Sequence, residues 1–290
     1  MIRLDAATVL LQWAVGGLLF LWVTTRRREV GLGYGWLLRG VFGVLAIGAV
    51  AAGRIGDAVV VRDVAAVGVV VASAVALAVS VVRRRAGVRG QREVEERRSA
   101  RVAAMTGIDR KVLARDVEAT EFPPWMDLVA PAVGAVGLVA AGVASAGAAA
   151  DAGEVVVAVL RTSVGAAFLG AVTDAMLLGH WYLVQPGLAR GPLNELNRWL
   201  ALIWPFEVAA LLLPTGMLSV LSGTVDDGYG GLLGWFWIAC AVTTIVLTLV
   251  TAAALKERAY SAVMAATGLL YLAILTAFGT DLVARAVLSG

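Results

Sequence analysis

Four ionisable side chains lie inside stretches of sequence that are otherwise apolar, and they are the residues best suited to chemistry. They are Arg39, Asp174, His180 and Glu207, and His180 is the only histidine of the chain. An ionisable group at the centre of a membrane span costs about 2.5–3.5 kcal/mol on insertion scales. We therefore expect each of the four to have either a partner or a function.

The two carboxylates are predicted to lie at similar depths in consecutive spans. Asp174 and Glu207 each stand about ten residues from the ends joined by the short loop 186–192, which places each of them about 15 Å deep at 1.5 Å per residue. Arg39 enters from the same side to a depth of about 10 Å. Neighbouring carboxylates favour sharing a proton, and a guanidinium keeps one of them ionised. These three residues are thus predicted to form a substrate, proton or ion pathway.

A purely structural ion pair is the alternative interpretation of the same three residues. Arg39 can neutralise Asp174 or Glu207 without any further role, or extend its side chain to the interface and meet neither. Pro205 favours a functional role for Glu207, because proline kinks a helix and frees a carbonyl group. Freed backbone at membrane depth is tolerated where it lines a cavity, so Glu207 is predicted to face one.

His180 belongs to a different group of residues. It lies about 120° around its helix from Asp174, so the two do not share a face. Beside it stand Trp181 and Tyr182, and Thr173 lies on the same side of the helix. The simplest interpretation is an interfacial histidine that hydrogen-bonds to backbone or headgroup. The alternative is a contact with a quinone or a haem made by His180, Trp181, Tyr182 and Thr173, although a second histidine ligand for haem is absent from the chain.

The composition identifies the elements that must position these residues. Hydrophobic residues make up 60% of the 290 residues and charged residues only 16%, far outside the range of soluble domains. The apolar residues come in blocks of about 20, the length that crosses about 30 Å of hydrocarbon. We therefore expect an all-α, polytopic transmembrane helical bundle whose main partner is the lipid bilayer. The predicted spans are 6–24, 33–53, 64–82, 127–148, 158–184, 198–220, 231–254 and 261–283.

The basic residues predict the orientation of these eight spans. If the spans alternate, most of the arginines and lysines outside them fall on one side, which identifies that side as cytoplasmic. They are Arg26, Arg27, Arg28, Arg83, Arg84, Arg85, Arg190, Arg198, Lys256 and Arg258. Both termini are then outside, in the plasma (inner) membrane. This topology explains the net charge of +3, so no nucleic-acid partner is expected.

The chain divides into three predicted parts. Residues 1–82 hold spans 1–3, residues 83–125 form a charged, amphipathic cytoplasmic loop, and residues 126–290 hold spans 4–8. The loop is interpreted as a solvated helical hairpin, with docking of a protein partner or sensing of anionic lipid as the alternatives. At the outer end of the last span, Asp281 and Arg285 are four residues apart and are predicted to form an ordinary surface ion pair.

The function is predicted only as a class. No signature of a hydrolase, kinase or metalloprotease is present, so an enzyme is not expected, and the single cysteine, Cys240, argues against a Cys-rich metal site. The first hypothesis is an ion- or proton-coupled carrier, or a transport subunit, with an intramembrane carboxylate site. The alternatives are a membrane subunit of an electron-transfer complex that binds quinone or haem near His180, and a structural membrane anchor. No cofactor is required by the first hypothesis.

Overall fold

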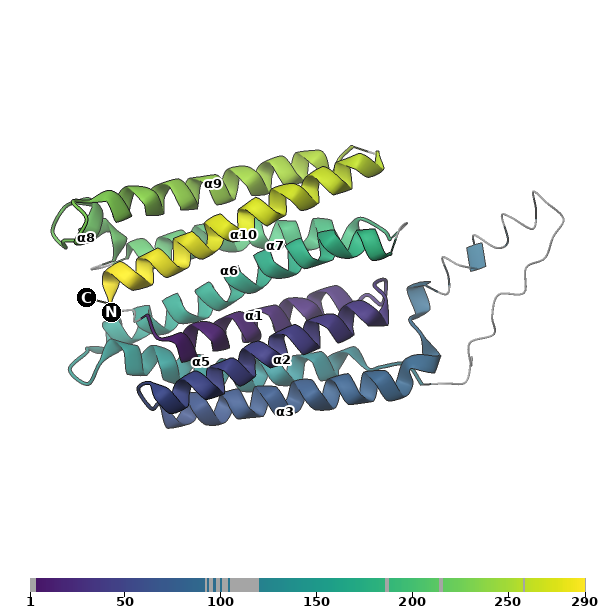
Figure 1. The fold of residues 1–290 in the computed structure, drawn as a ribbon, viewed down its shortest axis with the longest axis horizontal. Helices are drawn as coiled ribbons and strands as arrows, with labels where there is room; N and C mark the ends of the chain where they lie inside the picture. The colour runs from purple at the N-terminus through teal and green to yellow at the C-terminus, as the bar shows by residue number, and fades with distance from the viewer. Residues whose placement is uncertain are drawn as a thin grey trace.

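The computed structural model describes residues 4–91, 93, 96–97, 100, 104, 120–185, 188–213, 216–257 and 259–289. Over these residues the chain is an all-α bundle without a strand, which confirms the predicted fold class (Figure 1). The long helices are α1 (Ala6–Thr25), α2 (Leu32–Ile55), α3 (Val60–Val82), α5 (Val129–Ala146), α6 (Ala152–Val184), α7 (Gly191–Leu212), α9 (Leu232–Ala254) and α10 (Tyr260–Leu288). Short helical segments are η1 (Arg83–Ala86), η2 (Pro124–Leu128) and α8 (Met217–Leu221).

Seven of these helices are long and apolar enough to cross a membrane, counted over the described residues. The remaining long helix, α7, lies in the bundle beside α6 but is less apolar. Its first two turns carry Asn194, Glu195, Asn197 and Arg198, which lower the hydropathy of that end. The predicted sixth span, 198–220, is therefore present as a helix whose beginning is polar.

The helices alternate in direction, so the bundle has two distinct ends. The start of α1 and the end of α10 lie at the same end, on the left in Figure 1, which we call the termini end. The chain between α3 and α5 leaves from the opposite end, which we call the loop end. Most of the predicted amphipathic segment within 83–125 lies outside the described residues.

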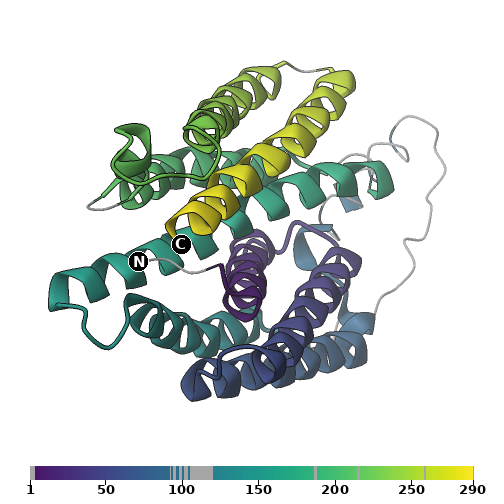
Figure 2. The same ribbon diagram turned by 60° about the vertical axis from the view of Figure 1, so that its left-hand side comes forward.

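Helix α6 is the centre of the arrangement. It packs against α1 and α5 on one side and against α7 and α10 on the other, so α1, α2, α3 and α5 lie mainly on one side of it and α7, α9 and α10 on the other (Figure 2). Helix α1 also contacts α7 and α10 directly, through Phe20 and Trp13. The crossing with α1 is very close, because a Cβ atom at Gly16 would lie 1.8 Å from the carbonyl oxygen of Ala166. Small residues allow such close approach of helix backbones in lipid.

The structure corrects the predicted span 198–220. Helix α7 begins at Gly191 and ends at Leu212, and α8 follows as a separate short helix. Arg161 of α6 donates hydrogen bonds from Nε to the carbonyl oxygen of Ala210 (2.9 Å) and from Nη2 to that of Leu213 (2.6 Å). The last carbonyl groups of a helix lack partners within the helix, so this buried guanidinium stabilises the end of α7 from a neighbouring helix.

Candidate functional site

Arg39 does not meet the carboxylates with which the sequence analysis grouped it. Its guanidinium is held by Asp127 in η2, with Nε to Oδ1 and Nη2 to Oδ2 both at 2.8 Å. The hydroxyl of Thr25 donates a third hydrogen bond to Asp127 at 3.0 Å, and the ring of Phe122 lies 4.4 Å from the guanidinium carbon. This is a bidentate ion pair close to the loop end, and each of its two residues is 3% exposed.

The true start of α7 explains why Asp174 and Glu207 are not at the same depth. Asp174 lies about 15 Å from the loop end of α6, as predicted from the helical rise. Because α7 begins at Gly191, Glu207 is 16 residues along its helix and about 24 Å from the same end. Glu207 is therefore closer to the termini end than predicted, and the expected site of Arg39, Asp174 and Glu207 is not formed.

Asp174 is isolated in the centre of the bundle. It is fully buried, and neither carboxylate oxygen accepts a hydrogen bond within the described residues. The hydroxyl of Tyr34 donates to the backbone oxygen of Asp174 at 3.3 Å, not to its side chain. A buried polar group without a hydrogen-bond partner is costly, so packing alone does not account for a carboxyl group at this position.

Glu207 instead lies against Asp281 and Arg285 of α10. Asp281 and Arg285 form the predicted ion pair. Glu207 and Asp281 are fully buried and Arg285 is 1% exposed, so the prediction that this pair lies at the surface is wrong. Arg285 donates from Nε to Asp281 Oδ2 at 2.7 Å. The physical reason for the difference is the neighbouring helix α6, where Gly165 leaves room for both side chains: a Cβ atom there would lie 2.9 Å from Asp281 Oδ1.

We call Glu207, Asp281 and Arg285 the open triad, because its hydrogen bonding is incomplete. Both oxygens of Glu207, Oδ1 of Asp281 and Nη2 of Arg285 have no donor–acceptor partner within the described residues. Glu207 is within side-chain hydrogen-bonding reach of Asp281. Two carboxylates can form such a bond only if one of them carries a proton.

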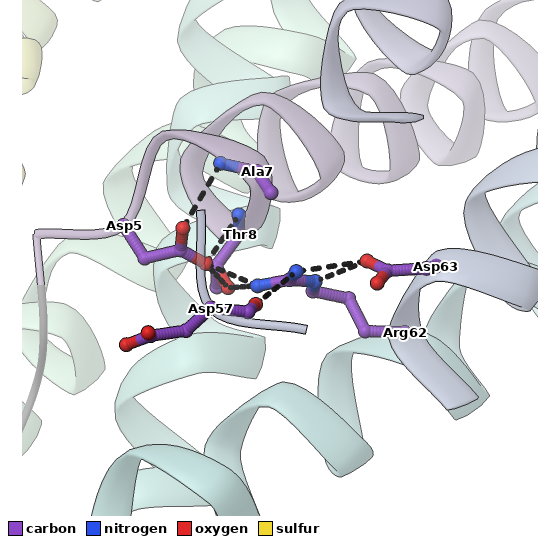
Figure 3. Close-up of polar contacts among 6 residues, drawn as sticks. All are labelled: Asp5, Ala7, Thr8, Asp57, Arg62 and Asp63. Atoms are coloured by element: carbon purple, nitrogen blue, oxygen red, sulfur yellow. Dashed lines mark hydrogen bonds and ion pairs between the residues drawn. The ribbon is translucent and has the colours of Figure 1, made fainter. Parts of the chain in front are cut away.

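A polar cluster at the termini end lies near the triad. Arg62 of α3 pairs with Asp5 and with Asp63, and it donates to the backbone oxygen of Asp57 at 3.0 Å (Figure 3). Asp5 also caps α1, where its carboxylate accepts the hydroxyl of Thr8. This cluster fastens the start of α3 to the start of α1.

A small cavity joins that cluster to the triad. It has a volume of about 40 Å³, and Asp5, Thr8 and Arg62 line it together with Thr162 and Arg285. A buried water needs roughly 10–15 Å³ of such volume and two to four polar partners. The cavity is therefore large and polar enough for about three water molecules between the termini end and Arg285.

The residues grouped around His180 point in different directions. His180 is exposed, and its Nδ1 lies 3.2 Å from the hydroxyl of Tyr271. Tyr182 is buried and donates to the carbonyl oxygen of Ala189 at 2.5 Å, whereas Trp181 donates to Gln185. A quinone or haem contact at His180 stays a prediction.

Thr173, the last member of that group, lies on another contact surface. It is buried and accepts a hydrogen bond from the indole nitrogen of Trp13 in α1 at 2.9 Å. Its own hydroxyl donates to the backbone oxygen of Leu169 at 2.7 Å. Thr173 thus joins α6 to α1, and no described contact brings it to His180.

The sequence analysis missed the roles of Asp127, Asp281 and Arg285. A usable signal was present for the last two, because an acid and a base four residues apart share one face of a helix. The helix extends to Leu288, so that face lies within the bundle and not beyond its end. Asp127 follows the interfacial Pro123-Pro124-Trp125 segment, a position that gives no sign of its distant partner.

The chain matches no protein-family model, no curated protein and no solved structure. The fold itself defines the class: this is a multi-pass α-helical membrane protein. Within that class, its distinguishing feature is a pair of buried charge sites, a closed pair near the loop end and an open triad near the termini end.

Proposed function

We propose that this protein is a proton-coupled membrane carrier, or a subunit of one, in which the carboxyl pair Glu207–Asp281 takes up and releases a proton. The observation that carries the proposal is the composition of the open triad: two fully buried carboxyl groups stand beside a single guanidinium. With both carboxyls ionised the triad has one negative charge in excess. One bound proton removes that excess.

A proton fits this site better than a metal cation. The guanidinium of Arg285 already pairs with Oδ2 of Asp281, at 2.7 Å, and supplies a positive charge at the site. A second positive ion beside it would be repelled in an environment of low dielectric constant. Protonation adds no bulk and needs only the hydrogen bond between the two carboxyl groups.

The cavity at the termini end supports an entry route. It brings Arg285 into contact with a space lined by Asp5, Thr8 and Thr162, where water can carry protons from the surface. Carboxylic residues inside spans commonly mark proton relays. Asp174, deeper in the bundle and without a partner, is the candidate for a second step toward the loop end.

The test is a measurement of proton flux with purified protein in liposomes that contain a pH-sensitive dye. Glu207→Gln preserves size and hydrogen bonding but cannot release a proton, so proton flux driven by an imposed pH gradient should be abolished. Asp226→Asn, an exposed carboxyl in the loop before α9, is the matched control and should retain the flux.

Infrared difference spectra between acid and neutral pH give a second readout. The band of a protonated carboxyl group should be lost in Glu207→Gln or Asp281→Asn and kept in Asp226→Asn. A folded Glu207→Gln variant that retains both the flux and the band would refute the proposal.

A further inference from the structure

The largest cavity among those described lies at the loop end, the same end as the closed pair, but neither buried charge site contributes a residue to its lining. It has a volume of about 580 Å³ and opens between the end of α1 and the first half of α7. It is lined by Arg27, Gly191, Asn194, Glu195, Arg198, Trp199 and Leu202. None of these residues takes part in the open triad, so an inference from this cavity is independent of the proposed function.

The charges at the cavity favour an anion. Glu195 is the carboxylate of the lining, and it is paired with Arg26 and, at 2.9 Å, with Arg27. Arg198 is exposed and has no hydrogen bond or ion pair within the described part of the chain. Three guanidinium groups thus stand beside one carboxylate, so this region keeps an excess of positive charge although Arg26 and Arg27 are paired with Glu195.

The polarity of α7 changes along the face that borders the cavity. Asn194, Arg198, Leu202 and Phe206 follow one another at steps of four residues, so they form one stripe with about 6 Å between successive members. The first two are polar and line the cavity, whereas Leu202 is 55% and Phe206 60% exposed. This face of α7 is thus polar and basic at its start and apolar and exposed further along. It matches a molecule with an anionic headgroup and an apolar chain.

Neighbouring aromatic residues indicate that the cavity lies at the level of the membrane–water interface. Trp199 lines the cavity and packs edge-on against Phe20 of α1, with ring centroids 6.3 Å apart. Arg26 stacks over the ring of Trp22 at 5.1 Å. Tryptophan is enriched where the hydrocarbon meets the headgroups, the level at which a lipid phosphate lies.

The geometry points to a binding site for an anionic phospholipid: Arg198 and Arg27 hold the headgroup phosphate in the cavity, and an acyl chain lies along Leu202 and Phe206. Basic pockets between membrane helices are suited to acidic headgroups. Guanidinium groups also match phosphate geometry well, because two N–H groups can point to two oxygens.

The experiment uses the full chain in an uncharged detergent, titrated with phosphatidylglycerol, with phosphatidylcholine and with inorganic phosphate while thermal unfolding is followed. Phosphatidylglycerol should raise the melting temperature saturably, and the other two additives should not. Arg198→Gln should weaken the apparent affinity for phosphatidylglycerol at least about tenfold, the loss expected for a hydrogen bond to a charged group. Arg27→Gln/Arg198→Gln should weaken it further.

The matched control is Arg84→Gln, which removes an exposed arginine at the same end of the bundle but outside the cavity. It should bind phosphatidylglycerol as the unmodified protein does. Equal losses in Arg84→Gln and Arg198→Gln would mean general charge attraction and would overturn the site. A melting shift produced equally by inorganic phosphate, or equally by phosphatidylcholine, would overturn the lipid as its occupant. Arg198 is exposed and unpaired, so its single variant remains a valid test if the double variant does not fold.

Discussion

The two buried charge sites differ in how completely their partners satisfy them. Arg39 and Asp127 form a closed pair in which both carboxylate oxygens accept a guanidinium hydrogen bond and Thr25 supplies a third donor, and Nη1 of Arg39 is its one buried polar atom without a partner within the described residues. The open triad has one carboxyl group more than its guanidinium can pair, and four of its polar atoms have no partner within the described residues. A closed pair needs both charges at all times, whereas under the proposed function the triad exists with or without a proton. The difference suggests a structural role for the first site and a chemical role for the second.

Removing one member of the closed pair should have the largest effect. Asp127→Asn strands the buried guanidinium of Arg39, and loss of one partner from a buried ion pair typically costs about 3–5 kcal/mol. The free energy of unfolding in detergent should fall by that amount, and the further change Arg39→Gln should restore part of it. If Asp127→Asn unfolds like the unmodified protein, the two sites do not differ in the way described.

Single changes in the open triad should cost less, because each remaining carboxyl group can take over as the partner of Arg285. We expect Glu207→Gln and Asp281→Asn each to lower the free energy of unfolding by less than about 2 kcal/mol, and the double variant to lower it by about 3–5 kcal/mol. A double-variant cycle measured by chemical denaturation gives the coupling. A single Glu207→Gln loss as large as that of Asp127→Asn would make Glu207 an obligatory partner and contradict the comparison.

The close packing of Gly165 against the triad can be tested by adding a methyl group at this position. Gly165→Ala places a methyl group 2.9 Å from Asp281 Oδ1 and 3.0 Å from Gln12 Nε2, so the neighbours must shift at a cost of about 1–3 kcal/mol. Gly268→Ala in α10 is the matched control, because no atom lies within 4 Å of its added Cβ atom. The control should unfold as the unmodified protein does, or with a gain of roughly 0.5–1 kcal/mol from helix propensity. Equal unfolding temperatures for the two variants would mean that the triad is loosely packed.

The smallest effect concerns the loop before α9, which lies at the same end as the triad and has an acid sensitivity of its own. The backbone N–H of Gly231, with those of Tyr229 and Leu233, holds the pKa of Asp227 below its usual range. The stabilisation by Asp227 is therefore present above the pKa of the unfolded chain and is lost as pH falls through the folded pKa. Melting curves of Asp227→Asn should converge with those of the unmodified protein at acid pH. If the melting curves of the two proteins still differ at acid pH, the acid sensitivity does not come from Asp227.

The sequence predicted the elements better than the contacts between them. The block of apolar residues predicted as 231–254 is α9 within one residue at its start, because a membrane helix is defined by its length and hydropathy. The start of α7 was missed because Asn194 and Glu195 are polar, although they belong to the helix. Residues facing lipid and residues facing other helices are both apolar, so hydropathy does not tell which faces meet.

The partner of Arg39 and the neighbours of Glu207 could not be predicted for the same reason. Arg39 and Asp127 are 88 positions apart, and nothing in the local pattern of either residue selects the other. Glu207 and Asp281 are on helices separated by α8 and α9. The depth argument for Asp174 holds because it depends only on the end of its own helix, whereas that for Glu207 fails because it depended on where α7 begins.

The hydrogen bonds from Arg161 to the end of α7 have a consequence for the order in which the chain enters the membrane. Their acceptors, the carbonyl oxygens of Ala210 and Leu213, are synthesised 49 and 52 residues after the arginine. Until these acceptors are synthesised, the guanidinium of Arg161 in α6 lacks them. An arginine at the centre of a single helix in lipid costs about 2.5–3.5 kcal/mol on insertion scales. Helix α6 is therefore expected to wait beside the insertion machinery and to leave it together with α7, as a hairpin and not as a single span.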